Sequence, residues 1–336
     1  AVERQAQRLL DVQPGHPVAA QFLVESLLVH DPDAALERAR GLIDAQRDDA
    51  DRMAMRGWFA RLLDRIGRPA QALAAWLSLH DDMRGGLLPL PARAAPVAEP
   101  WPPLAAAAAG ATRPLLVWGL PGSGVERVVD TLAAAGGPVR RDRFGAQAPN
   151  DPLRTPQAAH ALRDGSLEPA ALVEQWRAQL PARGIADCNV VDWLSWWDNA
   201  LLLALRPHLP EGRLLAAVRD PRDMLLDWLA TGSPVPLALQ DPDTAATWLA
   251  QGLEQLADLH EQDLYPHVLL RLDGVVDAPP ALAEAVGQAL GGLPLPPPPA
   301  VPRRLPPGHW RFYAELLAGP FARLAPVAVR LGYPEA

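Results

Sequence analysis

The chain has 336 residues, of which 49% are hydrophobic and 21% are charged, as in a folded protein large enough for about two domains. The formal net charge of −8 argues against an extended basic footprint for nucleic acid. The single cysteine, Cys188, excludes an intrachain disulfide and a cysteine-based metal site. All 31 basic residues are arginine, so no lysine is present to hold a phosphate or form a Schiff base.

The sequence carries no membrane signal. No apolar run approaches the roughly 18 residues of a spanning helix, and no charged, apolar and small-residue leader opens the sequence. Together with the lone cysteine, these features predict a cytoplasmic protein without a membrane partner. The sequence does not define the oligomeric state. Because Ala1 comes first, we expect a missing initiator methionine or a longer upstream segment.

Residues 1–86 read as a succession of helices. The stretches DPDAALERARGLIDA and GRPAQALAAWLSLHD recur about 35 residues apart, with alanine–leucine pairs at Ala35-Leu36 and Ala72-Leu73. Small residues at this period resemble tetratricopeptide repeats, in which helix pairs stack into a solenoid. A plain helical bundle is the alternative. Helices are predicted at about 1–12, 17–30, 33–46, 49–66 and 69–81.

The pattern changes after residue 86. Residues 87–113 are rich in proline and alanine and predict a linker between domains. From residue 114 to 336, strand and helix patterns alternate, which predicts a parallel sheet with helices on its faces. Ligands of such sheets lie beyond the carboxyl ends of the strands. The strand candidates are LLVWG, NVVDW, RLLAAVR and HVLLRL, and helices are expected at about 124–135, 168–178, 196–206, 221–230, 243–262, 279–290 and 308–331.

Two turns at the predicted sheet edge carry phosphate-binding features. The first, GLPGSG, follows a strand and opens a helix, so its amides and the helix N-terminus point at an anion. In the second, RDPRD, Arg219 leaves a strand and Pro221 starts a helix. Together these turns resemble the two phosphosulfate-binding motifs of sulfotransferases. The resemblance is closest to bacterial sulfotransferases that are fused to tetratricopeptide repeats.

The resemblance covers nearly the whole chain. It includes EGRLLAAVRDPRDMLLDWLA, HVLLRLDGVVDAPPALAEAVGQALGGLP and HWRFYAELLAGPFARLAPVAVRLGYP. It implies an α/β, parallel-sheet sulfotransferase-like domain of the P-loop type over 114–336, preceded by an α/α solenoid of about two and a half repeats. It also implies the donor 3′-phosphoadenosine-5′-phosphosulfate (PAPS). The first motif would wrap the 5′-phosphosulfate, and the second would bind the 3′-phosphate through an arginine and a serine.

Carried over residue by residue, the resemblance implies a residual donor site. The backbone of the first motif is kept, and Arg219 stands where the 3′-phosphate arginine belongs. Several side chains depart from the family pattern. The residues kept are Gly119, Pro121, Ser123, Gly124 and Arg219; Gly122 replaces a basic residue, Val125 and Glu126 replace two hydroxyls, Asp227 replaces the serine, and Asp192-Trp193 replaces an Asp-Lys pair.

These departures predict a weak donor site. A charge-assisted contact to phosphate contributes about 1.5–3 kcal/mol, so losing three or four removes most of the affinity. Glu126 and Asp227 would also repel a phosphate, and Arg127 should face away from the loop. The catalytic base is unassigned. The family's carboxylate falls near Gly145-Ala146, and Glu126 or Asp142 are possible substitutes.

Two further groups have a functional and a structural interpretation. Trp193, Trp196, Trp197 and Trp228 lie near the predicted site edge and would either line a groove for a peptide, sugar or aromatic ligand or fill the interior. We favour filling. HEQDLYPH, at 260–267, lacks metalloprotease spacing and is interpreted as a solvated helix end, so no metal site is expected.

The sequence thus predicts a catalytically impaired sulfotransferase relative. It would bind a protein or peptide partner through the repeats and the tryptophan-rich edge. One alternative is an active PAPS-dependent enzyme that transfers sulfate to a peptide, tyrosyl or glycan hydroxyl. In that case Ser123, the loop amides and Arg219 would hold PAPS or its product 3′-phosphoadenosine-5′-phosphate (PAP). Another alternative is a pocket that takes a plain nucleotide or a small metabolite.

Overall fold

The computed structural model describes residues 2–13, 16–145, 148–186, 188–301 and 304–335. It is a mixed α/β structure that divides into two compact units. The first comprises Ala1–Leu87 with Leu229–Thr231 and Ala238–Asp241, and the second comprises Leu88–Trp228, Gly232–Leu237 and Pro242–Ala336.

The first unit contains five α-helices in its described part, each packed against the next along the chain. Asp31 and Asp48 cap two of them by accepting hydrogen bonds from backbone N–H groups. Ala35 and Ala72, the alanines of the recurring stretches, are fully buried. The predicted helices are therefore present, while their assignment as tetratricopeptide repeats stays a prediction. Their bounds are Val2–Val12 (α1), Pro17–Leu27 (α2), Pro32–Asp44 (α3), Asp49–Arg65 (α4) and Pro69–Met83 (α5).

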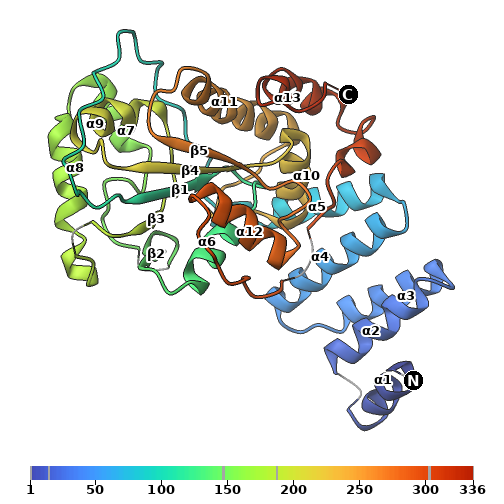
Figure 1. The fold of residues 1–336 in the computed structure, drawn as a ribbon. Coiled ribbons are helices and arrows are strands. Elements are labelled where there is room, and N and C mark those ends of the chain that lie inside the picture. Colours follow the sequence, from blue (N-terminus) through green and yellow to red (C-terminus); the bar gives the residue numbers. More distant parts are fainter. Residues whose placement is uncertain (1, 14–15, 146–147, 187, 302–303, 336) are drawn as a thin grey trace. The chain divides into compact units, whose positions relative to one another are not determined.

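The second unit is built on a five-stranded parallel sheet with the order β2-β3-β1-β4-β5 (Figure 1). The strands are Leu115–Gly119 (β1), Val139–Arg140 (β2), Val191–Trp193 (β3), Arg213–Val218 (β4) and His267–Arg271 (β5). Four of these were predicted. Strand β2 was not, because its two residues show no periodicity.

Helices flank the sheet. Helices α6 and α12 share one hydrophobic core with the strands, formed by residues such as Val128, Leu132, Val286, Leu215 and Leu270. Helix α11 lies beside α13 (Figure 1). The bounds are Val125–Ala134 (α6), Gln157–Asp164 (α7), Pro169–Ala178 (α8), Leu202–His208 (α9), Pro221–Thr231 (α10), Pro242–Glu261 (α11), Pro279–Ala289 (α12) and Ala318–Arg330 (α13).

The structure differs from the predicted helices at three places. Helix α7 was not predicted. The helix expected at 196–206 is a short 3₁₀ turn, Asn199–Leu201, followed by α9. The helix expected at 308–331 is interrupted: a 3₁₀ segment at His309–Tyr313 precedes α13, and Tyr313 and Leu317 are buried between the two helical parts.

The segment expected to be a linker is bound along the second unit. Its backbone at Ala105 donates to the carbonyl of Arg206, and the indole of Trp248 donates to the carbonyl of Pro91. Residues 88–113 therefore form part of this unit. Among the described helices, none has both the length and the apolar character needed to cross a bilayer.

Candidate functional site

The two turns meet where the sheet order places a ligand crevice. Strand β1 lies between β3 and β4, and the chain crosses from one side of β1 to the other between β3 and β4. Open α/β sheets bind ligands at the carboxyl ends of the strands next to such a switch point. The glycine turn follows β1 and Arg219 follows β4, so both lie at this edge.

The glycine turn packs tightly against α10. Gly122 and Gly124 have φ angles of +77° and +82°, which favour glycine. A Cβ atom at Gly122 would overlap the backbone of Met224. In this conformation the loop has no space for the basic side chain that the family resemblance implies at that position. Ser123 is fully buried, and its hydroxyl accepts a hydrogen bond from the Val125 N–H.

Arg219 is fully buried and bound by the protein itself. Its Nη1 donates to the carboxylate of Asp227 at 3.0 Å and to the carbonyl of Gly122 at 3.2 Å. Its Nη2 donates to the carbonyl of Leu305 at 3.0 Å. The structure thus brings Arg219 onto the glycine turn, as the resemblance implies. The acceptor that meets the guanidinium is a carboxylate of this chain.

Arg304 completes the cluster. Its guanidinium hydrogen bonds to both Asp227 and Glu126, and its backbone N–H donates to Asp277 at 3.0 Å. Burial lowers the pKa of the Arg304 guanidinium, but the charges of Asp227 and Glu126 outweigh it and hold that pKa above its usual value. Two arginines and two carboxylates therefore neutralise one another above the glycine turn.

The chain matches no protein-family model, no curated protein and no solved structure. The resemblance to sulfotransferases therefore rests on the sequence motifs alone and stays a prediction.

The other charged residues near the glycine turn are also engaged. Arg127 is buried and donates to Asp130 and to the carbonyl of Pro299, so it faces away from the loop as predicted. Burial raises the pKa of Asp142, but the hydrogen bond from Arg183 and the charges of Arg140 and Arg183 bring it below the usual value. A carboxyl with a lowered pKa is a poor general base near pH 7.

Among the described residues, the two remaining positions considered for the catalytic base, Glu126 and Gly145, do not provide an unpaired carboxylate. Glu126 hydrogen bonds to Arg304, as described above. Gly145 follows a 3₁₀ turn at Asp142–Phe144, and Ala146 lies outside the described residues.

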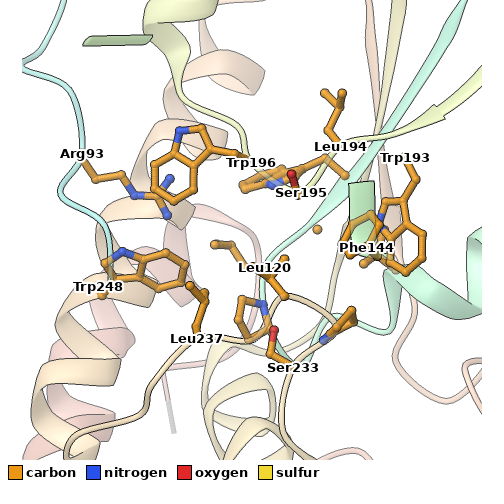
Figure 2. A pocket seen from close by; sticks show the side chains of 16 residues that line it. Arg93, Leu120, Phe144, Trp193, Leu194, Ser195, Trp196, Ser233, Leu237 and Trp248 are labelled. Carbon is orange, nitrogen blue, oxygen red and sulfur yellow. The ribbon is translucent and has the colours of Figure 1, made fainter. Parts of the chain in front are cut away.

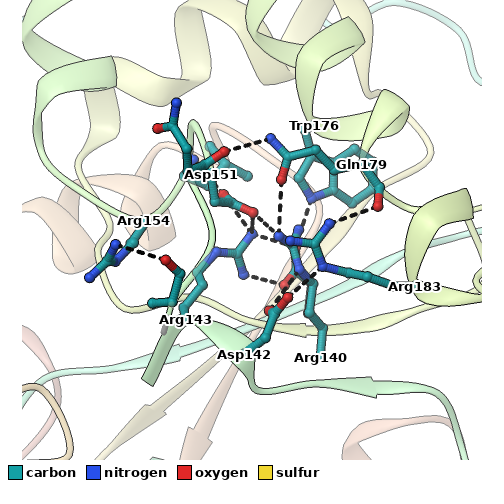
Figure 3. Close-up of polar contacts among 12 residues, drawn as sticks. Arg140, Asp142, Arg143, Asp151, Arg154, Trp176, Gln179 and Arg183 are labelled. Atoms are coloured by element: carbon teal, nitrogen blue, oxygen red, sulfur yellow. Dashed lines mark hydrogen bonds and ion pairs between the residues drawn. The ribbon is translucent and has the colours of Figure 1, made fainter. Parts of the chain in front are cut away.

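Asp192 anchors a buried polar network next to the sheet edge. Its carboxylate accepts hydrogen bonds from both terminal nitrogens of Arg143 and from the indole of Trp176 at 2.7 Å. Arg143 in turn contacts Asp151, and Figure 3 shows these charges grouped with Arg140. Where the resemblance implies an Asp-Lys pair at a strand end, this chain uses the aspartate to hold an arginine of its own.

The tryptophans fill the interior. Trp193, Trp196, Trp197 and Trp228 are exposed by only 8%, 6%, 0% and 0%. The interpretation favoured from the sequence was that these tryptophans fill the interior, and their small exposed fractions confirm it. The rings therefore offer little exposed surface, although Trp193 and Trp196 line a narrow pocket at this edge, and a partner at the tryptophan-rich edge stays a prediction.

The histidines of HEQDLYPH contact each other and hold no metal cluster. His260 Nδ1 lies 2.8 Å from His267 Nε2, and His267 Nδ1 lies 2.7 Å from the carbonyl of Tyr265. In the described ranges, no three His, Cys, Asp or Glu side chains come together as a metal site.

Sequence reasoning missed two arginines at this edge, Arg304 and Arg93. The carboxylates at Glu126 and Asp227 imply that some cation neutralises them, yet no local pattern singles out Arg304. Arg93 lies in the presumed linker, but its guanidinium is stacked between Trp196 and Trp248 (Figure 2). Only the folded chain brings it there.

Proposed function

We propose that this chain is a sulfotransferase-like protein whose donor cradle is closed by its own side chains, and that it acts by binding rather than by sulfate transfer. The observation that carries the proposal is the contact of the Asp227 carboxylate with buried Arg219. A carboxylate there takes the interaction that a 3′-phosphate would otherwise make. Binding PAPS or PAP would require breaking this pair and the contacts of Arg304.

The charges around the glycine turn disfavour a bound phosphate. A phosphate that enters beside Asp227 and Glu126 meets two like charges where little water screens them. It also finds no lysine, since the chain has none. Sulfuryl transfer needs positive charge on the leaving phosphate, so the same arrangement disfavours catalysis.

For the binding role, we place the protein or peptide partner on the helical unit. Several apolar side chains on its first helices are exposed, among them Val18 at 65% and Phe22 at 39%. Stacked helix pairs commonly present such side chains to extended or helical peptides. The buried tryptophans leave the second unit's sheet edge without an equivalent aromatic surface.

Calorimetry with PAP tests the closed cradle. We expect no binding by the wild-type chain at millimolar PAP. The double variant Glu126→Thr/Asp227→Ser removes both carboxylates and leaves the arginines, so it should gain at least about tenfold in PAP affinity. The control Asp243→Ser removes an exposed carboxylate on α11 that pairs with Arg323 and not with the cradle arginines, so it should leave PAP affinity unchanged. Micromolar binding by the wild type, lost in Arg219→Ala, would show an open donor site.

Cross-linking with a partner recovered on the full chain tests the binding role. We expect Val18→Ser/Phe22→Ser to abolish capture, while the polar surface change Arg38→Gln keeps it. Capture that survives the double change would place the partner elsewhere.

A further inference from the structure

Arg93 is the one candidate that the closed cradle does not account for. Its guanidinium lies between two indole rings, 4.5 Å from the centre of Trp196 and 4.7 Å from the centre of Trp248. Figure 2 shows it at the side of a pocket that also contains Leu120 and Leu237. This pocket lies beside the ends of β1 and β3, next to the glycine turn.

Most of the hydrogen-bonding capacity of this guanidinium is unused, because three of its five N–H groups belong to Nε and Nη2. Nη1 donates to the carbonyl of Trp197 at 2.9 Å. Nε and Nη2 are buried and have no hydrogen-bond partner, and no carboxylate of the described residues binds them. The N–H groups of Nε and Nη2 run parallel along one edge of the guanidinium, the edge that meets a carboxylate with two hydrogen bonds.

Burying a cation without a charged partner costs free energy, and the lowered pKa of Arg93 reflects this cost. Burial lowers the pKa of the Arg93 guanidinium to about 10, although the charge of Asp198 raises it in part. The carboxylate of Asp198 accepts from the N–H groups of Ala94 and Ala200 and from the Gln255 amide, so it is committed elsewhere. The guanidinium stays charged at neutral pH, and an anion that reached it would recover this lost free energy.

The shape of the pocket limits what can reach Arg93. About 400 Å³ lies between its side chains, including solvent at its mouth, but only about 20 Å³ is open to the centres of water-sized atoms. One water needs about 10–15 Å³ on that measure. The pocket between these aromatic and aliphatic side chains therefore has room for about one or two waters, so only a carboxylic acid of very few atoms fits without movement of the lining side chains.

We infer that this pocket is a binding site for a small apolar carboxylic acid, whose carboxylate pairs with the free Nε and Nη2 edge of Arg93. The indoles of Trp196 and Trp248 hold the guanidinium flat, so the edge is positioned before the ligand arrives. The apolar part of the ligand contacts Leu120 and Leu237.

Arg93 also borders a second cavity. The negative charge of that cavity excludes it as the binding site of a carboxylate. It has about 390 Å³ open to the centres of water-sized atoms, against about 20 Å³ in the first pocket, and it is lined by Glu99, Glu254 and Asp258. These carboxylates repel an anion. The carboxylate therefore reaches Arg93 from the tryptophan-lined pocket. The site does not depend on the state of the donor cradle, so PAP binding and carboxylate binding are separate measurements.

Titration of the full chain with formate and acetate, at constant ionic strength and neutral pH, tests the site. Tryptophan fluorescence should change saturably, because the ligand lies against Trp196 and Trp248. Acetamide has the same shape without the charge and should give no saturable change, and tetrahedral sulfate should not compete. Arg93→Lys keeps the charge but loses the two-pronged edge, and should weaken acetate binding at least about tenfold. Arg323→Lys, an exposed arginine on α13, is the matched control.

A wild-type measurement decides the matter even if Arg93→Lys does not fold. In ¹⁵N spectra that detect arginine side chains, acetate should shift one Nε–H signal and acetamide should not. An equal response to acetate and acetamide, no response to either carboxylate, or unchanged acetate binding by a folded Arg93→Lys would each overturn the site.

Discussion

The Nη1 atom of Arg219 lies 3.0 Å from Oδ2 of Asp227, and both side chains are completely buried. The two residues are eight positions apart, one just after β4 and the other on α10. The resemblance to sulfotransferases implies a serine at the second position. The aspartate found there forms an internal ion pair with the arginine to which the resemblance assigns an anion.

The first prediction concerns this pair. Removing one partner leaves an uncompensated buried charge, so Arg219→Met and Asp227→Leu should each lower the free energy of unfolding by about 3–5 kcal/mol. The double variant removes both charges and should lose much less than the sum. Urea unfolding of the four proteins gives the coupling energy. Strictly additive losses would mean that the two side chains do not stabilise each other.

A second prediction separates steric overlap from backbone strain at the glycine turn. Gly122 and Gly136 have nearly equal φ angles, +77° and +79°. A Cβ at Gly136 meets nothing within 4 Å, whereas one at Gly122 overlaps the backbone of Met224. Gly136→Ala should therefore lower the free energy of unfolding by only about 1–2 kcal/mol, the cost of left-handed backbone.

Gly122→Ala should lose clearly more, because the loop must move off α10. Thermal unfolding of both variants measures the difference. Equal losses would show that the loop yields easily and is not held against the helix.

A third prediction concerns pH. Burial raises the pKa of Asp223 from 3.8 to about 6, although the N–H groups of Trp310 and Gly308 donate to its carboxylate. Between these two pH values the folded chain keeps a proton that the unfolded chain has lost. Stability therefore falls as pH rises from about 4 to about 6, by up to about 3 kcal/mol at 1.36 kcal/mol per pKa unit.

Asp223→Asn cannot titrate and isolates this contribution. The free energy of unfolding of the wild type, minus that of Asp223→Asn, should decrease from pH 4 to pH 6 and then stay constant. Urea titrations at pH 4, 5, 6 and 7 supply the values. A difference that does not change with pH would mean that Asp223 titrates near its usual pKa.

The buried network at Asp192 leads to a fourth prediction. Asp192→Asn removes the charge that faces Arg143 and alters the hydrogen bond from Trp176. We expect a loss of about 3–5 kcal/mol in the free energy of unfolding. The exposed pair of Asp49 with Arg52 provides the control, and Asp49→Asn should lose less than about 1 kcal/mol. Similar losses of unfolding free energy in both variants would mean that burial does not increase the contribution of the Asp192 network to stability.

Local patterns predicted much of the architecture. Four of the five described helices of the first unit begin at prolines or after capping aspartates such as Asp31, whose preferences depend on nearby residues alone. Apolar runs identified β1, β3, β4 and β5, and their alternation with helices predicted the parallel sheet. From that topology followed the meeting of the glycine turn with Arg219 at one edge.

Which groups pair with Glu126 and Arg219 depends on contacts between distant parts of the chain. Arg304 is 178 residues from Glu126, and Leu305 is 86 residues from Arg219. No periodicity connects such positions, so the sequence showed which side chains depart from the pattern of the resemblance without showing which residues pair with Arg219 and Glu126. Arg93 was hidden for the same reason, because its proline-rich surroundings are typical of a linker.

The sequence by itself determined the order of elements, the sheet edge and the positions at which the glycine turn and its surroundings depart from the pattern of the resemblance. These follow from backbone preferences and hydrophobic periodicity, which act over a few residues. Only the tertiary structure decided that Asp227 and Arg304 occupy the cradle, that the tryptophans are buried, and that Arg93 keeps an unpaired edge. Charge pairing and burial depend on which distant segments pack together, and packing is decided by the whole folded chain.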